Sequence, residues 1–164
     1  MPPTHLVRAT TMAGTILSAA LWPIAWLLDL ARVRFLVRGN ALDRIGHLAM
    51  APDTYVKTGL IGWRPAYRGM LLAPPGAAVN PCLLEYWERY LTIVRHPVLV
   101  KLLRLFERMP RLQYGLGFVD VPQRGRMKIM PGVYAVHRRY QELMGGRPLL
   151  QLSAREQARG RQAL

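Results

Sequence analysis

The stretch DRIGHL, residues 43–48, gathers residue types that could bind and activate a substrate. A histidine such as His47 can accept or donate a proton near neutral pH. Arg44 can hold a phosphate or a carboxylate through paired N–H donors. Gly46 allows a ligand to approach the backbone closely, and Asp43 can cap a helix or orient a histidine. The same residues also fit an ordinary turn, so their spacing alone leaves both interpretations open.

Strands that alternate with helices are expected to position this stretch. The run VRFLV at 33–37 predicts a buried strand, closed by a turn that ends at Asn40. Further strands are expected at 67–75 and 112–122, and helices at 52–59, 80–96, 97–109 and 131–144. This order predicts an α/β fold with a mainly parallel sheet. Loops at the carboxyl ends of parallel strands line the ligand-binding crevice, and residues 43–48 would occupy that position.

Two of these helices carry clear start signals. Pro52 suits a first helical position, Asp53 suits the positive end of the helix and Lys57 suits its negative end. Asn80 followed by Pro81 is a typical pair of N-cap and first helical residue. We therefore expect helices to begin at Pro52 and at Pro81.

The chain is strongly basic, with 23 lysines and arginines against 9 acidic residues and a formal net charge of +14 over 164 residues. A hydrophobic content of 51% excludes disorder, and the single cysteine, Cys82, excludes an internal disulfide. The charge predicts attraction to a polyanion, such as anionic lipid headgroups, nucleic acid or a phosphorylated small molecule. No nucleic-acid-binding signature and no metal-ligand spacing accompanies it. The sequence therefore disfavours nucleic acid as a partner and predicts no metal site.

Residues 10–28 contain no charged side chain, and they include Trp22 and Trp26. This run is close to the length of about 20 residues that crosses a bilayer. Three alternatives remain open: a spanning anchor, a helix lying in the headgroups, or a helix packed on the domain. We expect residues 1–31 to form an apolar membrane-associated helix. The arginines that follow it would place the rest of the chain at the cytoplasmic face of the inner membrane.

The helix expected at 97–109 has an apolar side and a basic side. Its apolar side would contain Leu99, Leu102, Leu103 and Phe106, and its basic side Lys101, Arg104 and Arg108. Such a helix can lie on an anionic membrane or pack on its own core.

The stretches DRIGHLAMAPDTYVK (43–57) and NPCLLEYWERYL (80–91) resemble the amino-terminal region of a family of bacterial glycosyltransferases associated with surface-polysaccharide assembly. In that family an Arg-Ile-Gly-His-Leu motif follows the first strand. An Asn-Pro/Lys-x-Leu-Leu-x-Tyr-Trp motif opens a later helix. The resemblance covers residues 33–164 and implies half of a GT-B architecture, in which two Rossmann-like, three-layer domains face a cleft.

The resemblance also implies roles for individual residues. His47 would be the catalytic base that deprotonates an acceptor hydroxyl, and Arg44 would steady a phosphate or order the loop. Asn40, Asp43 and Gly46 would contact the bound ligand. The partners would be a nucleotide-sugar donor and a glycan or glycolipid acceptor. No cofactor or metal would be required, because helix dipoles and basic side chains can balance the departing diphosphate.

Residues 32–164 would then be the acceptor-side domain of an incomplete enzyme. The resemblance implies a donor-binding domain supplied by a partner chain or by a carboxyl-terminal domain that these residues do not include. We would not expect the chain to turn over alone. The alternative is a non-catalytic basic module that binds membranes.

Overall fold

The computed structural model describes residues 21–37, 42–151, 158 and 161. Residues 21–30 are helical. The elements that follow are β1 (Val33–Val37), α2 (Ile45–Leu60), β2 (Arg68–Leu72), α3 (Pro81–Trp87), β3 (Thr92–Val94), α4 (Pro97–Glu107), a 3₁₀ turn η1 (Pro110–Leu112), β4 (Gln113–Gly115), β5 (Phe118–Val121), β6 (Gly125–Lys128) and α5 (Ile129–Met144).

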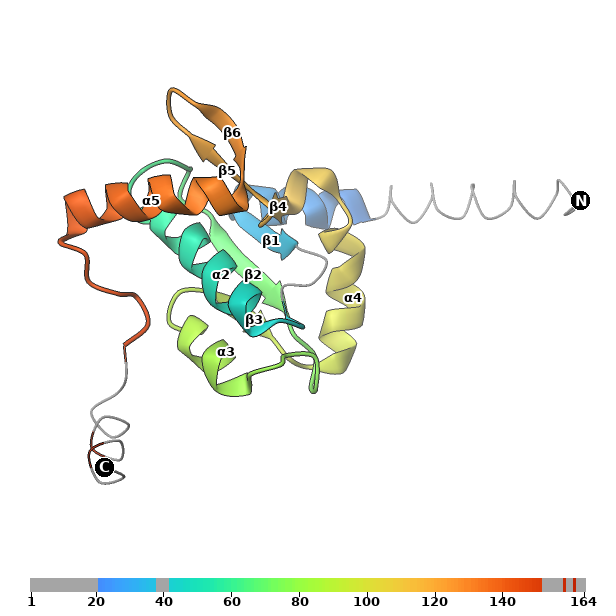
Figure 1. Cartoon of the computed structure of the whole chain (residues 1–164). Coiled ribbons are helices and arrows are strands. Elements are labelled where there is room, and N and C mark those ends of the chain that lie inside the picture. Colours follow the sequence, from blue (N-terminus) through green and yellow to red (C-terminus); the bar gives the residue numbers. More distant parts are fainter. Residues whose placement is uncertain (1–20, 38–41, 152–157, 159–160, 162–164) are drawn as a thin grey trace, which may run out of the picture.

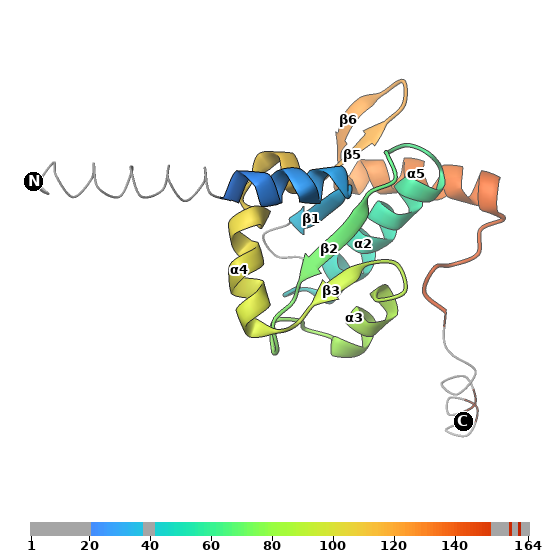
Figure 2. The same cartoon turned by 180° about the vertical axis from the view of Figure 1, so that it is seen from behind.

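Four parallel strands form the central sheet, in the order β3-β2-β1-β4 (Figure 1). Successive strand residues point to opposite faces, so Leu36 and Leu71 join one core while Phe35 and Leu72 join the other. Helices α2 and α3 cover the first face, and α4 and the helix of residues 21–30 cover the second, as the view from behind shows (Figure 2). The chain is therefore an α/β protein with a Rossmann-like arrangement, as the alternation of elements predicted.

Helix α2 begins at Ile45, so the prediction that it begins at Pro52 is wrong. Proline lacks a backbone N–H, and Pro52 therefore cannot donate to the carbonyl of Leu48 one turn earlier. The indole Nε1–H of Trp87, on α3, donates to that carbonyl instead, at 2.8 Å. Pro52, Leu48 and Trp87 are all fully buried. This bond replaces the hydrogen bond that the proline removes, and it lets the helix run through the proline.

Two other expected elements have different bounds. The helix expected at 80–96 ends at Trp87, and Thr92–Val94 form strand β3 beside β2. Three consecutive residues with β-branched side chains favour a strand over the helical spacing on which the prediction rested. The strand expected at 112–122 is divided by a turn at residues 116–117 into β4, in the main sheet, and β5, which pairs with β6 in a separate antiparallel hairpin.

A third core lies between α2, α5 and the β5–β6 hairpin. Ile61, Val119, Val136 and Tyr140 are among its buried residues. Helix α5 ends where predicted, because Gly145 adopts the left-handed conformation (φ 68°) that a helix C-cap favours.

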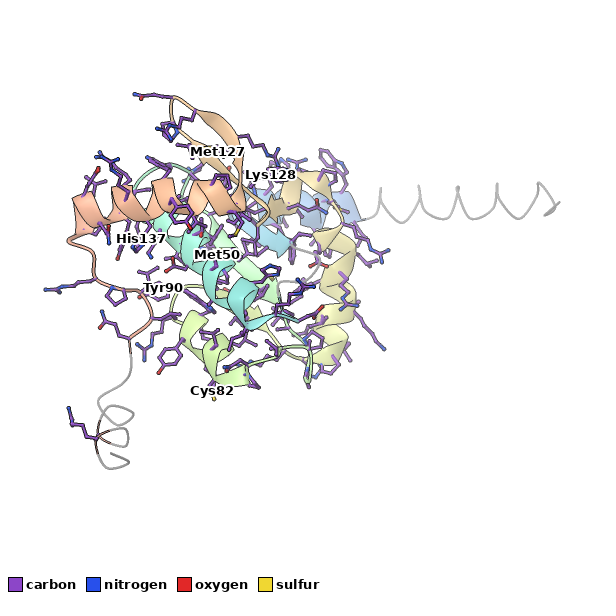
Figure 3. The ribbon with its side chains drawn as sticks, in the orientation of Figure 1. Met50, Cys82, Tyr90, Met127, Lys128 and His137 are labelled. Carbon is purple, nitrogen blue, oxygen red and sulfur yellow. The ribbon has the colours of Figure 1, made fainter. Side chains whose placement is uncertain are left out.

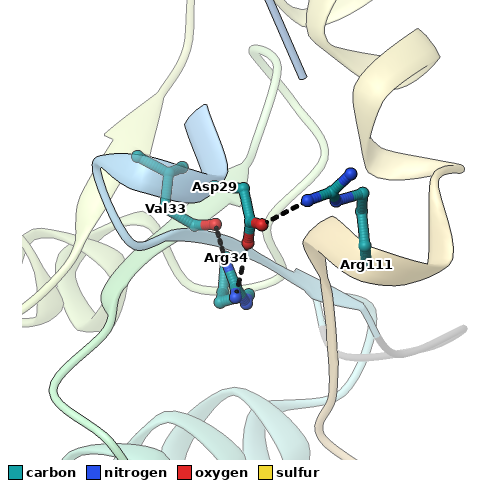
Figure 4. A network of polar contacts seen from close by, with 4 residues as sticks. All are labelled: Asp29, Val33, Arg34 and Arg111. Carbon is teal, nitrogen blue, oxygen red and sulfur yellow. Dashed lines mark hydrogen bonds and ion pairs between the residues drawn. The ribbon is translucent and has the colours of Figure 1, made fainter. Parts of the chain in front are cut away.

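Residues 1–20 lie outside the described residues, and so does most of the helix predicted at 1–31. Within the described residues no helix is both long enough and apolar enough to cross a membrane. Asp29, near the end of the helix of residues 21–30, bonds Arg34 on β1 at 2.8 Å and Arg111 on η1 at 2.6 Å (Figure 4). Arg34 also donates to the carbonyl of Val33 at 2.8 Å. One carboxylate thus holds three segments together near the start of β1.

The bond between Trp87 and Leu48 predicts a specific coupling with Pro52. We expect Trp87→Phe to lower the free energy of unfolding by about 1–3 kcal/mol, because the Leu48 carbonyl loses its donor inside the core. In a Pro52→Ala background the new backbone N–H can donate to that carbonyl, so the same substitution should cost less. Urea unfolding of the wild type, both single variants and the double variant measures the difference. An equal cost in both backgrounds would contradict the account.

The Asp29 network predicts a dependence of stability on pH. The hydrogen bond from Arg111 and the charge of Arg34 hold the pKa of the Asp29 carboxyl below its usual value of 3.8. The ionised network therefore stabilises the fold above about pH 4, and this contribution is lost as the pH falls through the lowered pKa. We expect Asp29→Asn to be less stable than the wild type at pH 7, and the gap to close toward pH 2 in urea unfolding. A stability difference of the same size at both pH values would contradict the prediction.

Candidate functional site

The candidate site lies at the carboxyl edge of the parallel sheet, beside β1. From β1 the chain passes through α2, on one face, to β2, and it later returns through α4, on the other face, to β4. Strands β2 and β4 therefore flank β1 with their connecting helices on opposite faces. In open α/β sheets this change of direction opens the crevice in which ligands bind.

Four of the five predicted site residues lie where the chain enters α2. Asp43 is exposed in the turn, and Arg44 is the exposed N-cap residue, whose side chain makes no capping hydrogen bond. Gly46 and His47 belong to the first helical turn, where Gly46 is exposed and His47 is half-buried. Asn40, the fifth, lies outside the described residues. Arg44, Gly46 and His47 thus lie at the helix start, directly after the turn that contains Asp43, because α2 begins before Pro52.

The loop that follows β2 is fastened to this entry. The backbone N–H of Val79 donates to the carbonyl of Leu42 at 2.9 Å. The next residue, Asn80, caps α3 by accepting from the N–H of Leu83 at 2.9 Å, as the Asn-Pro pair predicted. The residue just before the second motif is thus bonded to the residue just before the first one.

Sequence reasoning missed a second cation at this edge. Arg95 and His96 directly follow β3, so they lie at the carboxyl edge of the same parallel sheet as Arg44. The Arg95 guanidinium pairs with Glu88 at 2.7 Å. Because a helix was predicted through residue 96, Arg95 and His96 were not expected at the sheet edge. The three β-branched residues Thr92–Val94 are the signal that indicates a strand ending there.

Gly46 is not required by the packing of the fold. A Cβ atom built on it meets nothing within 4 Å, and its backbone is helical. Gly69 and Gly132 differ, because a Cβ there would lie 2.7 Å from the Tyr55 ring or 2.9 Å from the Val119 side chain. The space beside Gly46 is therefore open to a ligand.

A second polar group lies farther along α2. Lys57 is 5% exposed, pairs with Asp53 at 2.8 Å and has its Nζ 3.4 Å from Nδ1 of His137, on α5. The Tyr140 ring centroid is 5.1 Å from the same nitrogen. Lys57 lies in the last turn of α2, as predicted, whereas Asp53 lies within the helix rather than at its positive end, so that prediction is wrong. Ten residues of helix, about 15 Å, separate Lys57 from His47, so this group belongs to the contact of α2 with α5 (Figure 3).

A tyrosine and arginine group stabilises the sheet side of α2. The Arg64 guanidinium lies 3.7 Å above the Tyr55 ring, and its Nε donates to the Tyr55 carbonyl at 2.9 Å. The Tyr55 hydroxyl donates to the carbonyl of Tyr67 at 3.2 Å. Burial raises the pKa of Tyr55 to about 12, so its hydroxyl stays protonated near neutral pH. Tyr55 is therefore a structural donor and not a base.

Among the described residues, no three His, Cys, Asp or Glu side chains lie close enough together to hold a metal ion. Cys82 is exposed on α3 (Figure 3). Comparison of the chain with protein-family models, with curated proteins and with solved structures finds no match.

A Cβ atom has open space at Gly46 but would overlap neighbours at Gly69, so substitution by alanine should change the stability of the fold in opposite directions at these two positions. We expect Gly46→Ala to stabilise the fold by up to about 1 kcal/mol, since alanine favours a helix and meets no neighbour. Gly69→Ala should instead cost about 1–3 kcal/mol, because its methyl group overlaps the Tyr55 ring. Thermal and urea unfolding of both variants measures the two effects. A loss of stability in Gly46→Ala would show that the helix start is packed.

Proposed function

We propose that the chain is the acceptor-side domain of a GT-B-type glycosyltransferase. It would transfer a sugar from a nucleotide-sugar donor to a glycan or glycolipid acceptor, at the cytoplasmic face of the inner membrane. A partner chain or a further domain would bind the donor. The observation that carries the proposal is the position of the Arg-Ile-Gly-His-Leu motif, which begins α2 beside the change of direction in the sheet.

The reaction assigns a task to each residue of the motif. His47 takes the proton of the acceptor hydroxyl as its oxygen attacks the anomeric carbon of the sugar. The bond between that carbon and the diphosphate oxygen breaks, and the diphosphate departs with the electron pair. Arg44 and the positive end of α2 provide charge of the sign that a phosphate or a developing oxyanion needs. The open space at Gly46 gives the acceptor room beside the helix start.

Half-burial of His47 suits a base in this position. Its ring is neither in the core nor fully exposed, so it can meet an acceptor hydroxyl while the helix fixes its direction. Arg44 is more exposed, and its side chain makes no hydrogen bond at the helix cap. An exposed guanidinium at the positive end of a helix can bind a ligand anion.

The proposal predicts that His47 is essential for sugar transfer. We expect His47→Ala to lower kcat/KM by about 10²–10⁴-fold, the usual contribution of a positioned base. The assay would combine the longest protein that the gene encodes, together with any partner chain, with radiolabelled nucleotide sugars and a lipid and glycan extract. Gly46→Ala should weaken acceptor binding although it does not unfold the protein, which would appear as a raised KM for the acceptor.

His137→Ala provides the matched control, because it removes an exposed histidine on α5 that lies far along the fold from the motif. It should leave transfer within about two-fold of the wild type. Full activity of His47→Ala would remove that residue from the mechanism. Lack of transfer with every donor, in protein whose folding is verified, would overturn the proposed function and favour the non-catalytic alternative.

A further inference from the structure

The helix of residues 21–30 presents an outward face without a polar side chain. Ala25 faces the core at 1% exposure. The exposed residues on the other side are Trp22 (57%), Pro23, Ile24 (48%), Trp26 (47%), Leu27 (59%) and Leu30 (60%). A helix packed on a soluble domain usually has charged or polar residues on its outer face. The outer face of this helix is therefore suited to an apolar surrounding.

Helix α4 lies on the same face of the sheet and also exposes apolar side chains. Its core residues are Val100 and Phe106, which share an apolar core with Ala25. Leu99 and Leu102, on the predicted apolar side of this helix, are 50% and 53% exposed, together with Val98 at 57%. We call the exposed apolar residues of these two helices the docking face.

The charged residues in and beside these two helices are mostly basic. Residues 21–34 and 97–112 contain Arg32, Arg34, Lys101, Arg104, Arg108 and Arg111 as basic side chains, and Asp29 and Glu107 as acidic ones. Asp29 is engaged by Arg34 and Arg111. Burial raises the pKa of the Glu107 carboxyl above its usual value, against the opposing charges of Arg104 and Arg108. The rim of the face is therefore strongly cationic.

One arginine connects the cationic rim to the apolar face. The Arg111 guanidinium lies 5.2 Å from the ring centroid of Trp22 and is held there by Asp29 at 2.6 Å. Tryptophan rings and arginines are both enriched at the boundary between the acyl chains and the phosphates of a bilayer. An indole beside a fixed guanidinium is therefore suited to that boundary.

We propose that the docking face binds an anionic lipid bilayer, with the two helices lying in the interface. Trp22 and Trp26 enter the headgroup boundary, Leu27 and Leu30 reach the acyl chains, and the basic rim contacts lipid phosphates. Apolar burial combined with attraction to anionic lipids is the general basis of such binding. The charge complementarity selects this partner over a second copy of the chain, since two cationic rims would repel each other.

Co-sedimentation of the full chain with vesicles tests the proposal. We expect binding to vesicles of phosphatidylglycerol and phosphatidylethanolamine, and at least tenfold weaker binding to phosphatidylcholine vesicles. The triple variant Trp22→Ala/Trp26→Ala/Leu27→Ala should bind the anionic vesicles at least tenfold more weakly than the wild type. The variant Lys101→Gln/Arg104→Gln/Arg108→Gln should bind more weakly and lose part of the salt dependence.

The matched control is Met130→Ala/Tyr134→Ala, which removes equally exposed apolar residues from α5 (59% and 75% exposed) and should bind like the wild type. Circular dichroism verifies that each variant is folded. Wild-type binding by the triple variant, in which residues 1–20 are intact, would overturn the proposal. So would a solution dimer that the triple substitution dissociates, because the face would then serve a second copy. Neither result depends on sugar transfer, so this test and the test of the proposed function fail separately.

Discussion

The hydrogen bond from the Trp87 indole to the Leu48 carbonyl supports the arrangement of the whole first face. It satisfies the acceptor that Pro52 leaves without its helical donor, and it does so inside a core from which water is excluded. The same bond joins α3 to α2. Because α2 can continue through the proline, residues 45–51 become the first two turns of a helix that packs on β1 and β2.

Because α2 runs without a break through Pro52, Gly46 and His47 are held in a helix rather than in a loop. Had the helix begun at Pro52, Gly46 and His47 would belong to a loop, free to adopt many conformations. As part of the first helical turn, their positions are set by the packing of Leu48 and Ala51 against the sheet. A base that is fixed by a rigid element loses less entropy when it meets its substrate than a base on a mobile loop. The buried indole of Trp87 on α3 thus helps to fix the position of His47 at the sheet edge, because it allows α2 to begin before Pro52.

The sequence was sufficient for features that depend on neighbouring residues. Strand β1, the cap at Asn80 and the stop at Gly145 each follow from local backbone chemistry. It was insufficient where a partner distant in sequence decides the outcome. Nothing near Pro52 indicates that Trp87 replaces its missing donor, and nothing near Lys57 places it beside His137. Of the candidate site, the sequence could supply the residue types and the strand before them. Their place in the first turn of α2, and the openness at Gly46, required the packed structure.

The sheet separates the two surfaces for which functions are proposed, yet α2 and α4 begin at the same edge. Helix α2 begins at the carboxyl edge on the first face, and α4 begins there on the second face, directly after β3. The helix of residues 21–30 precedes β1, so its last turn lies at the amino edge, and the proposed docking face includes residues from both edges of the sheet. In the proposed reaction, an acceptor anchored in the same bilayer would have to reach the carboxyl edge, where α2 begins, to meet His47. The cationic rim would attract anionic lipids to the docking face, and this gives the basic composition of the chain a role in the proposed membrane binding.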